Sequence, residues 1–448
     1  MKIKKFSIAV AAAFLAIAGS ASAAGFALIE QNASGMGNAF AGAAAVAEDA
    51  STIFFNPAGM SYLPDSQLVV AAHAIRPSAK FDNDGSHRSA LTGGLATPGS
   101  NGGDAGDLAF IPNFYFARSV TDNIRLGIGV NAPFGLKTEY SKGWVGRYQA
   151  VKSELKTINI NPSISVKAGE RLALGFGISA MHAEADLTNA VDFGTICAAA
   201  LGGCGIGATF QRNDGKARLE GDDWGFGWNA GVIFQATQAT RVGLAYRSQV
   251  HHTLDGTVRF SNVPAAFALS PLLTATFANG NASAKLTTPD SLSASLLHQI
   301  DDQWDVMADL TWTRWNKFEQ LTAIRSSGTI VSNVPEHWKN TLRASVGASY
   351  RYNDTLKARI GVAYDESPVP SAYRTPRIPD NDRVWLALGA SYKLAPASSL
   401  DASYAHLFVH DASIDKTTDT SSAALRDVLK GNYDSDVNIL SVQYTHSF

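Results

Sequence analysis

Residues 342–365 read LRASVGASYRYNDTLKARIGVAYD. On either side of Tyr352-Asn353-Asp354, apolar side chains alternate with small, polar or charged ones. A period of two is typical of a β-strand whose two faces meet different surroundings, whereas a helix would repeat every three to four residues. The stretch therefore predicts two antiparallel strands joined by a short turn.

The same alternation recurs beyond residue 66 in fourteen segments. They are 67–77, 109–119, 123–132, 154–168, 171–185, 220–236, 240–250, 286–299, 303–315, 338–352, 355–365, 383–394, 399–409 and 437–448. Short turns and long connections alternate between them, the long ones near 78–108, 133–153, 186–219, 251–285, 316–337, 366–382 and 410–436. Strands of soluble sandwiches are usually about five or six residues long, which is shorter than these. The pattern predicts an all-β fold, a 14-stranded antiparallel transmembrane β-barrel, closed because lipid offers no partner to an unpaired backbone edge.

Aromatic side chains near the strand ends favour a membrane location, since such barrels carry an aromatic girdle at each interface. The candidates are Trp304, Trp312, Tyr350, Tyr364, Tyr392, Tyr404 and Phe408. The last segment alternates and finishes on Phe448, which resembles the C-terminal strand signal of outer-membrane barrels. The alternative for this segment is a buried terminal strand of a soluble protein.

The amino-acid composition and net charge exclude some classes of protein. Of 448 residues, 46% are hydrophobic and only 17% are charged, whereas roughly a quarter is usual for a soluble domain. The net charge of −2 excludes a strongly basic nucleic-acid-binding chain. The one long apolar run lies at the extreme N-terminus, which excludes a bundle of transmembrane helices.

The chain is predicted to have three parts. Residues 1–23 read as a signal peptide, with a basic start, an apolar middle and the cleavage site Ala21-Ser22-Ala23. Residues 24–66 do not alternate and are too apolar for a disordered tail. Because the lumen of a fourteen-stranded barrel is wide, we expect them to form an N-terminal plug inside the barrel of residues 67–448.

Two cysteines, Cys197 and Cys204, lie close together in a Gly/Ala-rich segment. An exported protein meets an oxidising compartment, so we expect a disulfide that closes this small loop. Two free thiols are the alternative. A metal site is the third reading, although the segment offers no histidine.

The non-alternating segment and two later loops resemble the FadL family of outer-membrane long-chain fatty acid transporters. The resemblance is carried by Gly35-Met36-Gly37-Asn38-Ala39-Phe40-Ala41-Gly42, Asn56-Pro57-Ala58, Asp365-Glu366-Ser367-Pro368-Val369-Pro370 and Ile378-Pro379-Asp380-Asn381-Asp382-Arg383-Val384-Trp385-Leu386. It covers essentially the whole mature chain. The tripeptide Asn56, Pro57 and Ala58 is a weak signal by itself and becomes specific beside the others.

The resemblance implies a monomeric barrel with an N-terminal hatch, which moves hydrophobic compounds without an energy source. It further implies that ligand caught by external loops passes to a lumenal pocket and leaves sideways at a kink of the third strand, here 123–132. That strand ends at Asn131-Ala132-Pro133, where proline removes a ladder donor. Lys339 matches the position that meets the ligand carboxylate in the family, whereas the expected arginine on the fifth strand is absent.

Two groups of residues are candidates for ligand binding. The loop 251–285 is strongly apolar for an external loop, which indicates either a binding patch or a loop core packed against 186–219. Its candidates are Phe267, Leu269, Leu272, Leu273 and Phe277. By alternation Lys339, Arg343, Lys357 and Arg359 face the lumen, where they either meet a carboxylate or pair with lumenal aspartates.

The expected function is passive uptake of long-chain fatty acids through the outer membrane of a Gram-negative bacterium. The same channel with neutral cargo, such as aromatic hydrocarbons, is the first alternative, since it would need no arginine on the fifth strand. A remote alternative is an outer-membrane lipid hydrolase, although no catalytic set or metal-ligand spacing stands out. No cofactor or nucleic-acid partner is expected. The expected partners are a hydrophobic small molecule, outer-membrane lipid and lipopolysaccharide.

Overall fold

The computed structural model describes residues 24–88, 93–202, 211, 214–416 and 427–448. The predicted signal peptide, residues 1–23, and Cys204 lie outside these ranges. The pairing of Cys197 with Cys204 therefore stays a prediction.

One sheet contains all the strands of the described chain. They are β1 (Ser66–Asn83), β2 (Ala109–Ser119), β3 (Ile124–Asn131), β4 (Gly135–Glu139), β5 (Lys152–Lys167), β6 (Leu172–Asp192), β7 (Asp214–Gln235), β8 (Thr240–Arg247), β9 (Val250–Ser261), β10 (Gly280–Thr288), β11 (Ser291–Gln299), β12 (Trp304–Thr313), β13 (Gln320–Arg325), β14 (Ile330–Pro335), β15 (Thr341–Arg351), β16 (Leu356–Asp365), β17 (Arg383–Ala395), β18 (Ser398–Val409), β19 (Ala412–Asp415) and β20 (Lys430–Ser447).

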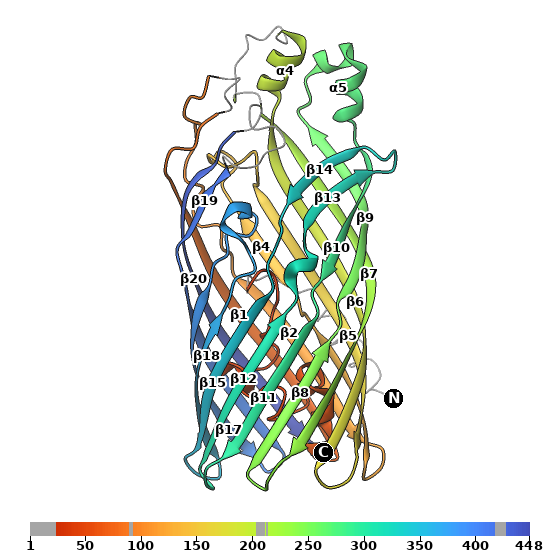
Figure 1. The fold of residues 1–448 in the computed structure, drawn as a ribbon, viewed down its shortest axis with the longest axis vertical. Helices are drawn as coiled ribbons and strands as arrows, with labels where there is room; N and C mark the ends of the chain where they lie inside the picture. The colour runs from red at the N-terminus through yellow and green to blue at the C-terminus, as the bar shows by residue number, and fades with distance from the viewer. Residues whose placement is uncertain (1–23, 89–92, 203–210, 212–213, 417–426) are drawn as a thin grey trace.

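The sheet closes on itself as a fourteen-stranded barrel, which confirms the predicted fold. Around the barrel the order is β1-β2-β3-β5-β6-β7-β8-β11-β12-β15-β16-β17-β18-β20, and every neighbouring pair is antiparallel. Strand β20 pairs with β1 from Gln67 to Asn83, which satisfies the last backbone edge. Figure 1 shows the tilted strands, with short turns at one end and long loops at the other.

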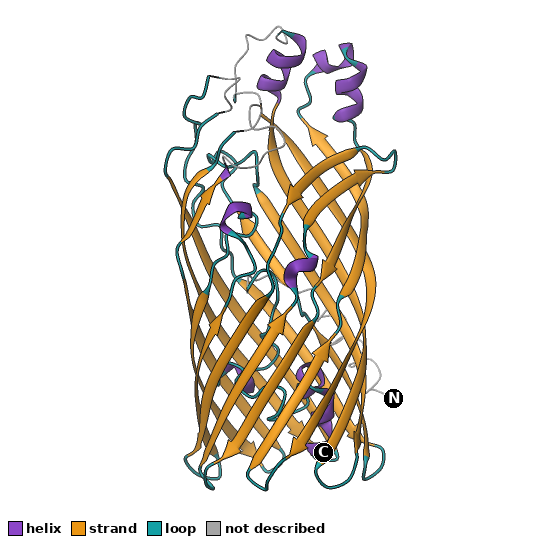
Figure 2. Cartoon of the chain, viewed as in Figure 1, coloured by secondary structure: helices purple, strands orange, loops and turns teal. Residues whose placement is uncertain are grey.

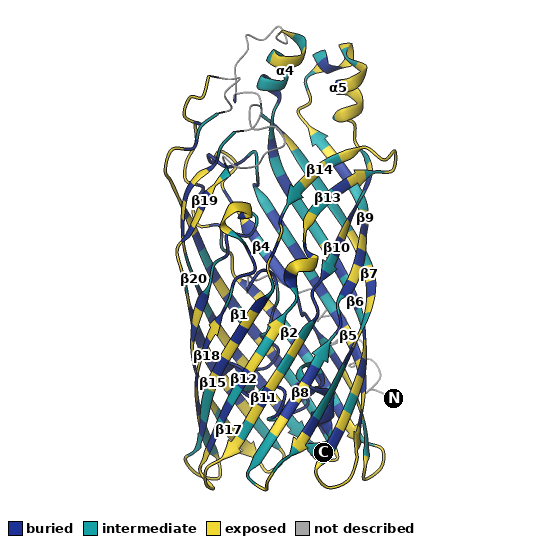
Figure 3. Ribbon diagram, viewed as in Figure 1, coloured by how far each residue is buried: buried dark blue, intermediate teal, exposed yellow. Residues whose placement is uncertain are grey.

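Side chains alternate between the lipid face and the lumen as the sequence pattern predicts (Figure 3). On β17, Trp385 and Ala387 are buried, whereas Leu386 and Leu388 are exposed. Most of the predicted girdle aromatics are exposed as well, among them Trp304, Trp312, Tyr364, Tyr392, Tyr404 and Phe408.

The long-loop end contains structure that the alternation missed. Strands β4, β9, β10, β13, β14 and β19 extend the wall beyond the barrel, and short helices lie in some of the connections between strands at this end (Figure 2). The segment predicted as one strand, 286–299, is two strands, β10 and β11, separated by Pro289 and Asp290. Proline cannot donate to the ladder, and Asp290 instead accepts a hydrogen bond from Arg314 Nε at 2.7 Å.

Eight short helices complete the described chain. They are α2 (Ala33–Met36), α3 (Thr52–Phe55), η1 (Pro57–Tyr62), α4 (Phe193–Leu201), η3 (Ala265–Leu269), α5 (Pro271–Thr276), η4 (Trp315–Lys317) and η5 (Ser371–Tyr373). None of the helices in the described ranges is long and apolar enough to cross a membrane.

Residues 24–66, which we call the N-terminal segment, lie inside the barrel near the short-turn end (Figure 1). Two buried asparagines attach this segment to the wall. Asn38 donates to the carbonyls of Ala348 and Ile360, at 2.7 and 3.2 Å. Asn56 donates to the carbonyl of Val232 at 3.1 Å and caps η1 by accepting from the Ala58 N–H at 3.1 Å. The motif residues Asn56, Pro57 and Ala58 thus start a helix and attach it to β7.

Inward-facing glycines make room for this segment. A Cβ added at Gly243 would overlap the backbone of Ala44, and one added at Gly361 would overlap the backbone of Asn38. The small residues that alternate with apolar ones in the strands therefore have a packing reason, since they let a second backbone approach the wall closely.

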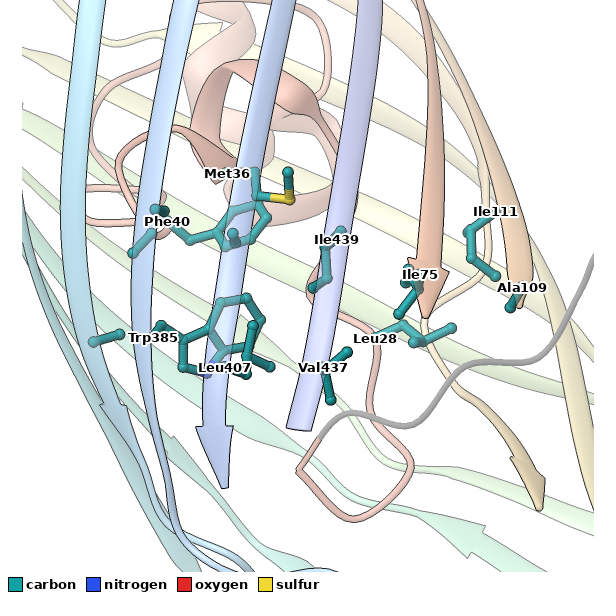
Figure 4. Packing of buried hydrophobic residues seen from close by; sticks show 14 of the residues in the cluster. Leu28, Met36, Phe40, Ile75, Ala109, Ile111, Trp385, Leu407, Val437 and Ile439 are labelled. Atoms are coloured by element: carbon teal, nitrogen blue, oxygen red, sulfur yellow. The ribbon is translucent and has the colours of Figure 1, made fainter. Parts of the chain in front are cut away.

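An apolar cluster covers one side of the contact between segment and wall (Figure 4). Met36 and Phe40 pack against Trp385 and Leu407, while Leu28 reaches across to Ile75, Ile111 and Ala109. All of these side chains are buried. Burial of apolar surface contributes about 25 cal/mol per Å², so this cluster holds the segment in place together with the asparagine contacts.

Candidate functional site

The third strand is interrupted where the family resemblance implies a kink. Strand β3 ends at Asn131, β4 resumes at Gly135, and Pro133 lies in the break. Residues 26–28 of the N-terminal segment pair with this break, because the Leu28 N–H donates to the Pro133 carbonyl at 2.8 Å and the Gly135 N–H donates to the Phe26 carbonyl at 2.9 Å. The wall at this point thus bonds to the N-terminal segment.

The break leaves one edge of β2 without a strand partner in the described chain. Strand β2 pairs with β3 only from Phe114 to Ser119, and its residues 109–113 pair with β1 alone. Behind this unpaired edge, Leu28 packs against Ala109, Ile111 and Ala132. The wall therefore lacks ladder pairing along this edge of β2, a place that we call the lateral gap, and the N-terminal segment covers its inner side.

Phe26 is the centre of an aromatic cluster in the lumen, made of Phe26, Phe134, Trp315, Phe318 and Trp338. Its ring centroid lies 4.7 Å from that of Trp315, 5.4 Å from Trp338, 5.6 Å from Phe318 and 5.8 Å from Phe134. The pairs with Phe134, Trp315 and Phe318 are edge-to-face, and such pairs contribute about 0.5–1.5 kcal/mol each beyond their buried area. The start of the N-terminal segment is therefore held by aromatic packing as well as by backbone pairing.

The loop motifs near residues 367 and 380 also hold the start of this segment. Asp380 accepts from the Gly25 N–H at 2.8 Å and from the Ser367 hydroxyl at 2.7 Å, and it forms an ion pair with Arg383. Pro368 lies against Gly25. These contacts give the two quoted loop stretches a shared structural role.

Two cavities meet at the aromatic cluster. The upper cavity, toward the long loops, is lined by Phe26 and Phe318 together with leucines and alanines of β4, β5, β7, β9 and β10. The lower cavity is lined by Phe134 and Trp315 together with Leu28, Ile29, Phe54 and Phe55 of the N-terminal segment. Phe26 lines the upper cavity and contacts Phe134 and Trp315 of the lower one. The lower cavity also has four charged lining residues, Arg247, Asp309, Arg343 and Asp365.

Each cavity contains buried charge. In the lower cavity, Arg343 is only 6% exposed, and of its guanidinium nitrogens only Nη2 has a partner, the Ala39 carbonyl at 2.8 Å. Its Nε and Nη1 have no hydrogen-bond partner among the described residues. A buried guanidinium with unused N–H donors is suited to a carboxylate.

In the upper cavity, Arg377 and Glu336 line the wall beside the leucines. Burial lowers the pKa of Arg377 to about 10, with Glu336 acting in the opposite direction. Burial raises the pKa of Glu336 to about 7, opposed by the Trp338 indole N–H and by Lys416 and Arg377. Neither residue was singled out by the sequence, because both lie in loops where alternation gives no signal.

Of the four cations predicted to face the lumen, three lie inside the barrel and one is exposed outside both cavities. Arg343 and Arg359 are buried inside the barrel, and Lys357 forms an ion pair with Glu48. Lys339 is exposed and lines neither cavity, and its charge instead lies near Asp382. The phase of the alternation changes before β15, so that Trp338 points into the aromatic cluster. A ligand role for Lys339 stays a prediction.

The predicted apolar loop divides into a core and an exposed surface. Phe267 and Leu273 are buried against Phe193 and Cys197, and Phe277 packs partly against the same cluster. Leu269 and Leu272 are 82% and 74% exposed. The buried residues fit a packed loop core, and the two exposed leucines fit a binding patch. A ligand role for all five residues stays a prediction.

Glu48 links the N-terminal segment to the wall by charge. It pairs with Lys357, and with Arg359 at 2.7 Å, while Arg359 also pairs with Asp401 at 2.8 Å. Burial acts to raise the pKa of Glu48, but Arg359 and Lys357 outweigh it and hold the pKa well below the ordinary 4.5. The stability that these ion pairs contribute is therefore full above about pH 4.5 and is lost as the pH falls from that value through the lowered pKa.

We expect Glu48→Gln to loosen residues 45–52 at pH 7, because Arg359 would lose one charged partner of a type that contributes about 1.5–3 kcal/mol. Hydrogen exchange of these residues should rise in the variant at pH 7. In the unchanged protein exchange should begin to rise as the pH falls below about 4.5 and should reach that of the variant only when the pH falls through the lowered pKa of Glu48. The control is Asp354→Asn, which removes an exposed turn carboxylate that lines the same open cavity as Glu48. It should leave the hydrogen exchange of residues 45–52 unchanged. Equal exchange in Glu48→Gln and the unchanged protein would contradict the role of this contact.

Comparison with known proteins identifies a family whose sequence pattern matches this chain. The family described as "Outer membrane protein transport protein (OMPP1/FadL/TodX)" matches residues 14–448. The chain is 32% identical to outer membrane protein P1 of Haemophilus influenzae, with 100% of each chain covered. It is also 32% identical to the long-chain fatty acid transport protein of Escherichia coli (strain CFT073), over 90% of this chain and 91% of that protein.

Two solved structures are similar to the fold of this chain. A Pseudomonas aeruginosa FadL homologue is similar with a TM-score of 0.86 at 27% identity, covering 95% of this chain and 100% of that one. The toluene transporter TodX of Pseudomonas putida shares the fold, with a TM-score of 0.65 at 19% identity over 89% and 94% of the two chains.

Proposed function

This chain belongs to the OMPP1/FadL/TodX family of outer-membrane transport proteins, and we propose that within it the protein is a passive channel for long-chain fatty acids. The observation that carries the proposal is the buried Arg343, which has two unused N–H donors and lies in the lower of two neighbouring cavities that both have apolar lining residues. A fatty acid presents the complementary chemistry, a long apolar tail and one carboxylate.

The energetics favour such a ligand in these cavities. Each methylene that leaves water contributes about 0.8 kcal/mol, so a tail of many carbons gains most in an extended apolar lining. A carboxylate without partners would oppose entry by several kcal/mol. In our proposal, the free Nε and Nη1 of Arg343 offset that cost in the lower cavity.

Binding to purified protein tests the substrate. Oleate should bind saturably, and Arg343→Gln should weaken oleate binding at least tenfold while leaving that of oleyl alcohol within about twofold, because one charge-assisted contact is lost. Toluene tests the alternative cargo. If the intact barrel binds toluene and neither oleate nor oleyl alcohol, the fatty-acid assignment fails and the neutral cargo replaces it.

We propose that the N-terminal segment acts as the plug of this channel and that ligand leaves through the lateral gap. Three contacts support this role: the pairing of residues 26–28 with the strand break, Leu28 behind the unpaired edge of β2, and the attachment of Asn38 and Asn56 to the wall. A shift of residues 26–28 would uncover the gap without opening the rest of the barrel.

Ala132→Phe is expected to slow fatty acid uptake severalfold, because Ala132 is buried beside the unpaired edge and a ring there would fill the gap. Binding of oleate in detergent should stay within about twofold, since Ala132 lines neither cavity. The measurement is uptake of labelled oleate by cells that carry each variant as their only copy. Ala395→Phe, at the exposed end of β17, is the control that should leave uptake unchanged. Unchanged uptake in Ala132→Phe would contradict lateral release.

The exposed loop leucines give a second expected effect. Leu269→Asn with Leu272→Asn should lower uptake severalfold at low oleate concentration and little at high concentration, because exposed apolar patches concentrate apolar ligands. Oleate affinity of the lumen should be unchanged. Val120→Asn, an exposed apolar residue at a short turn, is the control. Equal loss at all concentrations would indicate a folding defect instead of lost capture.

A further inference from the structure

Glu30, in the N-terminal segment, is a buried carboxylate that the proposed function does not use. The residue is 1% exposed, and its Oε2 has no hydrogen-bond partner among the described residues. No ion pair of Glu30 is found in the same ranges. An ionised carboxylate in such surroundings is costly unless a cation or several donors compensate it.

Three inward-facing residues of neighbouring strands form a row of alternating charge. In the strand register Arg343 on β15 lies opposite Asp365 on β16, and Asp365 lies opposite Arg383 on β17. All three residues are buried. Opposite residues of an antiparallel pair have Cβ atoms about 4.5–5.5 Å apart, so the aspartate of the row is flanked by an arginine on each side.

The charges around this row already balance one another. The lining of the lower cavity contains two arginines and two aspartates, which are Arg247, Arg343, Asp309 and Asp365. Arg383 forms its ion pair with Asp380, and Arg374 lies near Asp380 and Asp382. Each of these arginines can thus be matched with one aspartate, which leaves Glu30 as a surplus carboxylate.

Two further titratable side chains point inward from strands packed against this part of the segment. His73 on β1 bonds to the Ser441 hydroxyl through Nδ1, and the Tyr115 hydroxyl on β2 donates to Gln31 Oε1 at 3.0 Å. Neither side chain forms a hydrogen bond with Glu30 in the described chain. The charged groups that act on Glu30 are therefore those of the row.

Glu30 gains and loses its proton near neutral pH. Burial raises the pKa of Glu30 to about 7, against the effects of its own backbone N–H, Arg383 and Arg343, and Asp365 acts in the same direction as burial. A ligand carboxylate at Arg343 would add a negative charge and would neutralise one of the two arginines that favour ionised Glu30. Both changes favour the protonated form of Glu30.

We propose that Glu30 is the proton acceptor of the lower cavity and takes up one proton from water when a fatty acid carboxylate binds at Arg343. The proposal rests on the proposed function and adds proton coupling to it. The proton binds a carboxylate oxygen of Glu30, while the ligand stays ionised and accepts hydrogen bonds from Arg343. Anion and proton enter together, so the buried cluster gains no net charge. Oleate should therefore bind less tightly as the pH rises above 7, because Glu30 then has to be protonated from a solution with fewer protons.

Titration calorimetry of the purified full-length barrel measures this proton directly. Oleate is titrated at pH 8 in two buffers with different heats of ionisation, and oleyl alcohol is titrated in the same way. Because Glu30 is mostly ionised at pH 8, we expect uptake of about 0.5–1 proton per oleate and none per oleyl alcohol. Between pH 7 and 8.5 the affinity for oleate should fall about tenfold, whereas that for oleyl alcohol should stay within about twofold.

Glu30→Gln keeps the shape of the side chain and removes the proton acceptor. This variant should bind oleate without proton uptake and with an affinity that changes less than about twofold from pH 7 to 8.5. Any pH dependence that belongs to oleate itself would remain in the variant and can be subtracted. Binding of oleyl alcohol shows that its cavity is intact. Glu170→Gln, at an exposed short turn, is the matched control that should retain the full proton uptake.

Infrared difference spectroscopy gives a second measurement that needs no variant. Oleate with a ¹³C-labelled carboxylate is added to the unchanged protein at pH 8, so that the bands of the ligand are shifted away from those of the protein. We expect the band of a protonated protein carboxyl group to grow as oleate binds and to stay constant with oleyl alcohol. If Glu30→Gln does not bind oleyl alcohol, this measurement alone decides.

The failures of the two proposals can be told apart. Equal proton uptake in Glu30→Gln and the unchanged protein, or oleate binding without proton uptake in the unchanged protein, overturns the role of Glu30 while the channel function stands. Absence of the new carboxyl band at saturating oleate does the same. If the unchanged protein binds no oleate at any pH from 6 to 8.5, the proposed function itself fails.

Discussion

Replacing Gly243 and Gly361 together by valine is expected to displace the N-terminal segment from the wall and to open the barrel to ions. Both positions face inward at a point where the segment's backbone touches the wall, at Ala44 and Asn38. The wall strands cannot retreat, because each is paired on both sides. The segment therefore has to move, and it would lose the Asn38 contacts with Ala348 and Ile360.

Planar bilayer recording measures this effect directly. We expect conductance at least tenfold above that of the unchanged protein, together with protease cleavage within residues 36–60. Gly143→Ala is the matched control, because an added Cβ there meets nothing within 4 Å. A double variant that stays closed and resists protease would show that the segment is not what fills the barrel.

The barrel could be predicted from the sequence because one physical rule governs every strand. A residue of a membrane barrel faces either lipid or the lumen, so that the alternation in 342–365 is repeated in all the segments. The hairpin predicted there is observed, with β15 ending at Arg351 and β16 starting at Leu356. The break after Asn131 could also be read, because Pro133 removes a donor.

The binding residues could not be predicted in the same way, because alternation stops where strands stop. Lys339 and Arg343 are both odd-numbered and seemed equivalent in the sequence, yet only Arg343 lies within the regular part of β15. At 338–340 the backbone follows the aromatic packing of Trp338 instead of the pleat. Arg377 and Glu336 come from loops, whose side-chain directions depend on contacts between distant parts of the chain.

Removing the Phe26 ring is expected to affect binding more than any other single truncation in the lumen. Phe26→Ala would remove all four ring contacts of this residue in the aromatic cluster at once. Truncating a buried phenylalanine to alanine costs about 3–5 kcal/mol, which acts here on the attachment of residues 26–28 to the strand break. The upper cavity would also enlarge toward the lower one, since this ring lines the upper cavity and contacts Phe134 and Trp315 of the lower one.

We expect Phe26→Ala to weaken oleate binding at least tenfold and to raise hydrogen exchange at residues 26–31. Added benzene should partly restore both, because an apolar void left by a ring takes up benzene in preference to water. Phe81→Ala is the control, since it removes a buried ring from a cluster outside both cavities and away from the apolar loop. Phe26→Leu should weaken oleate binding less than Phe26→Ala does. If Phe26→Ala binds oleate normally and exchange at residues 26–31 is unchanged, then Phe26 is only one of many contacts, and the segment is held by Asn38, Asn56 and Glu48 without it.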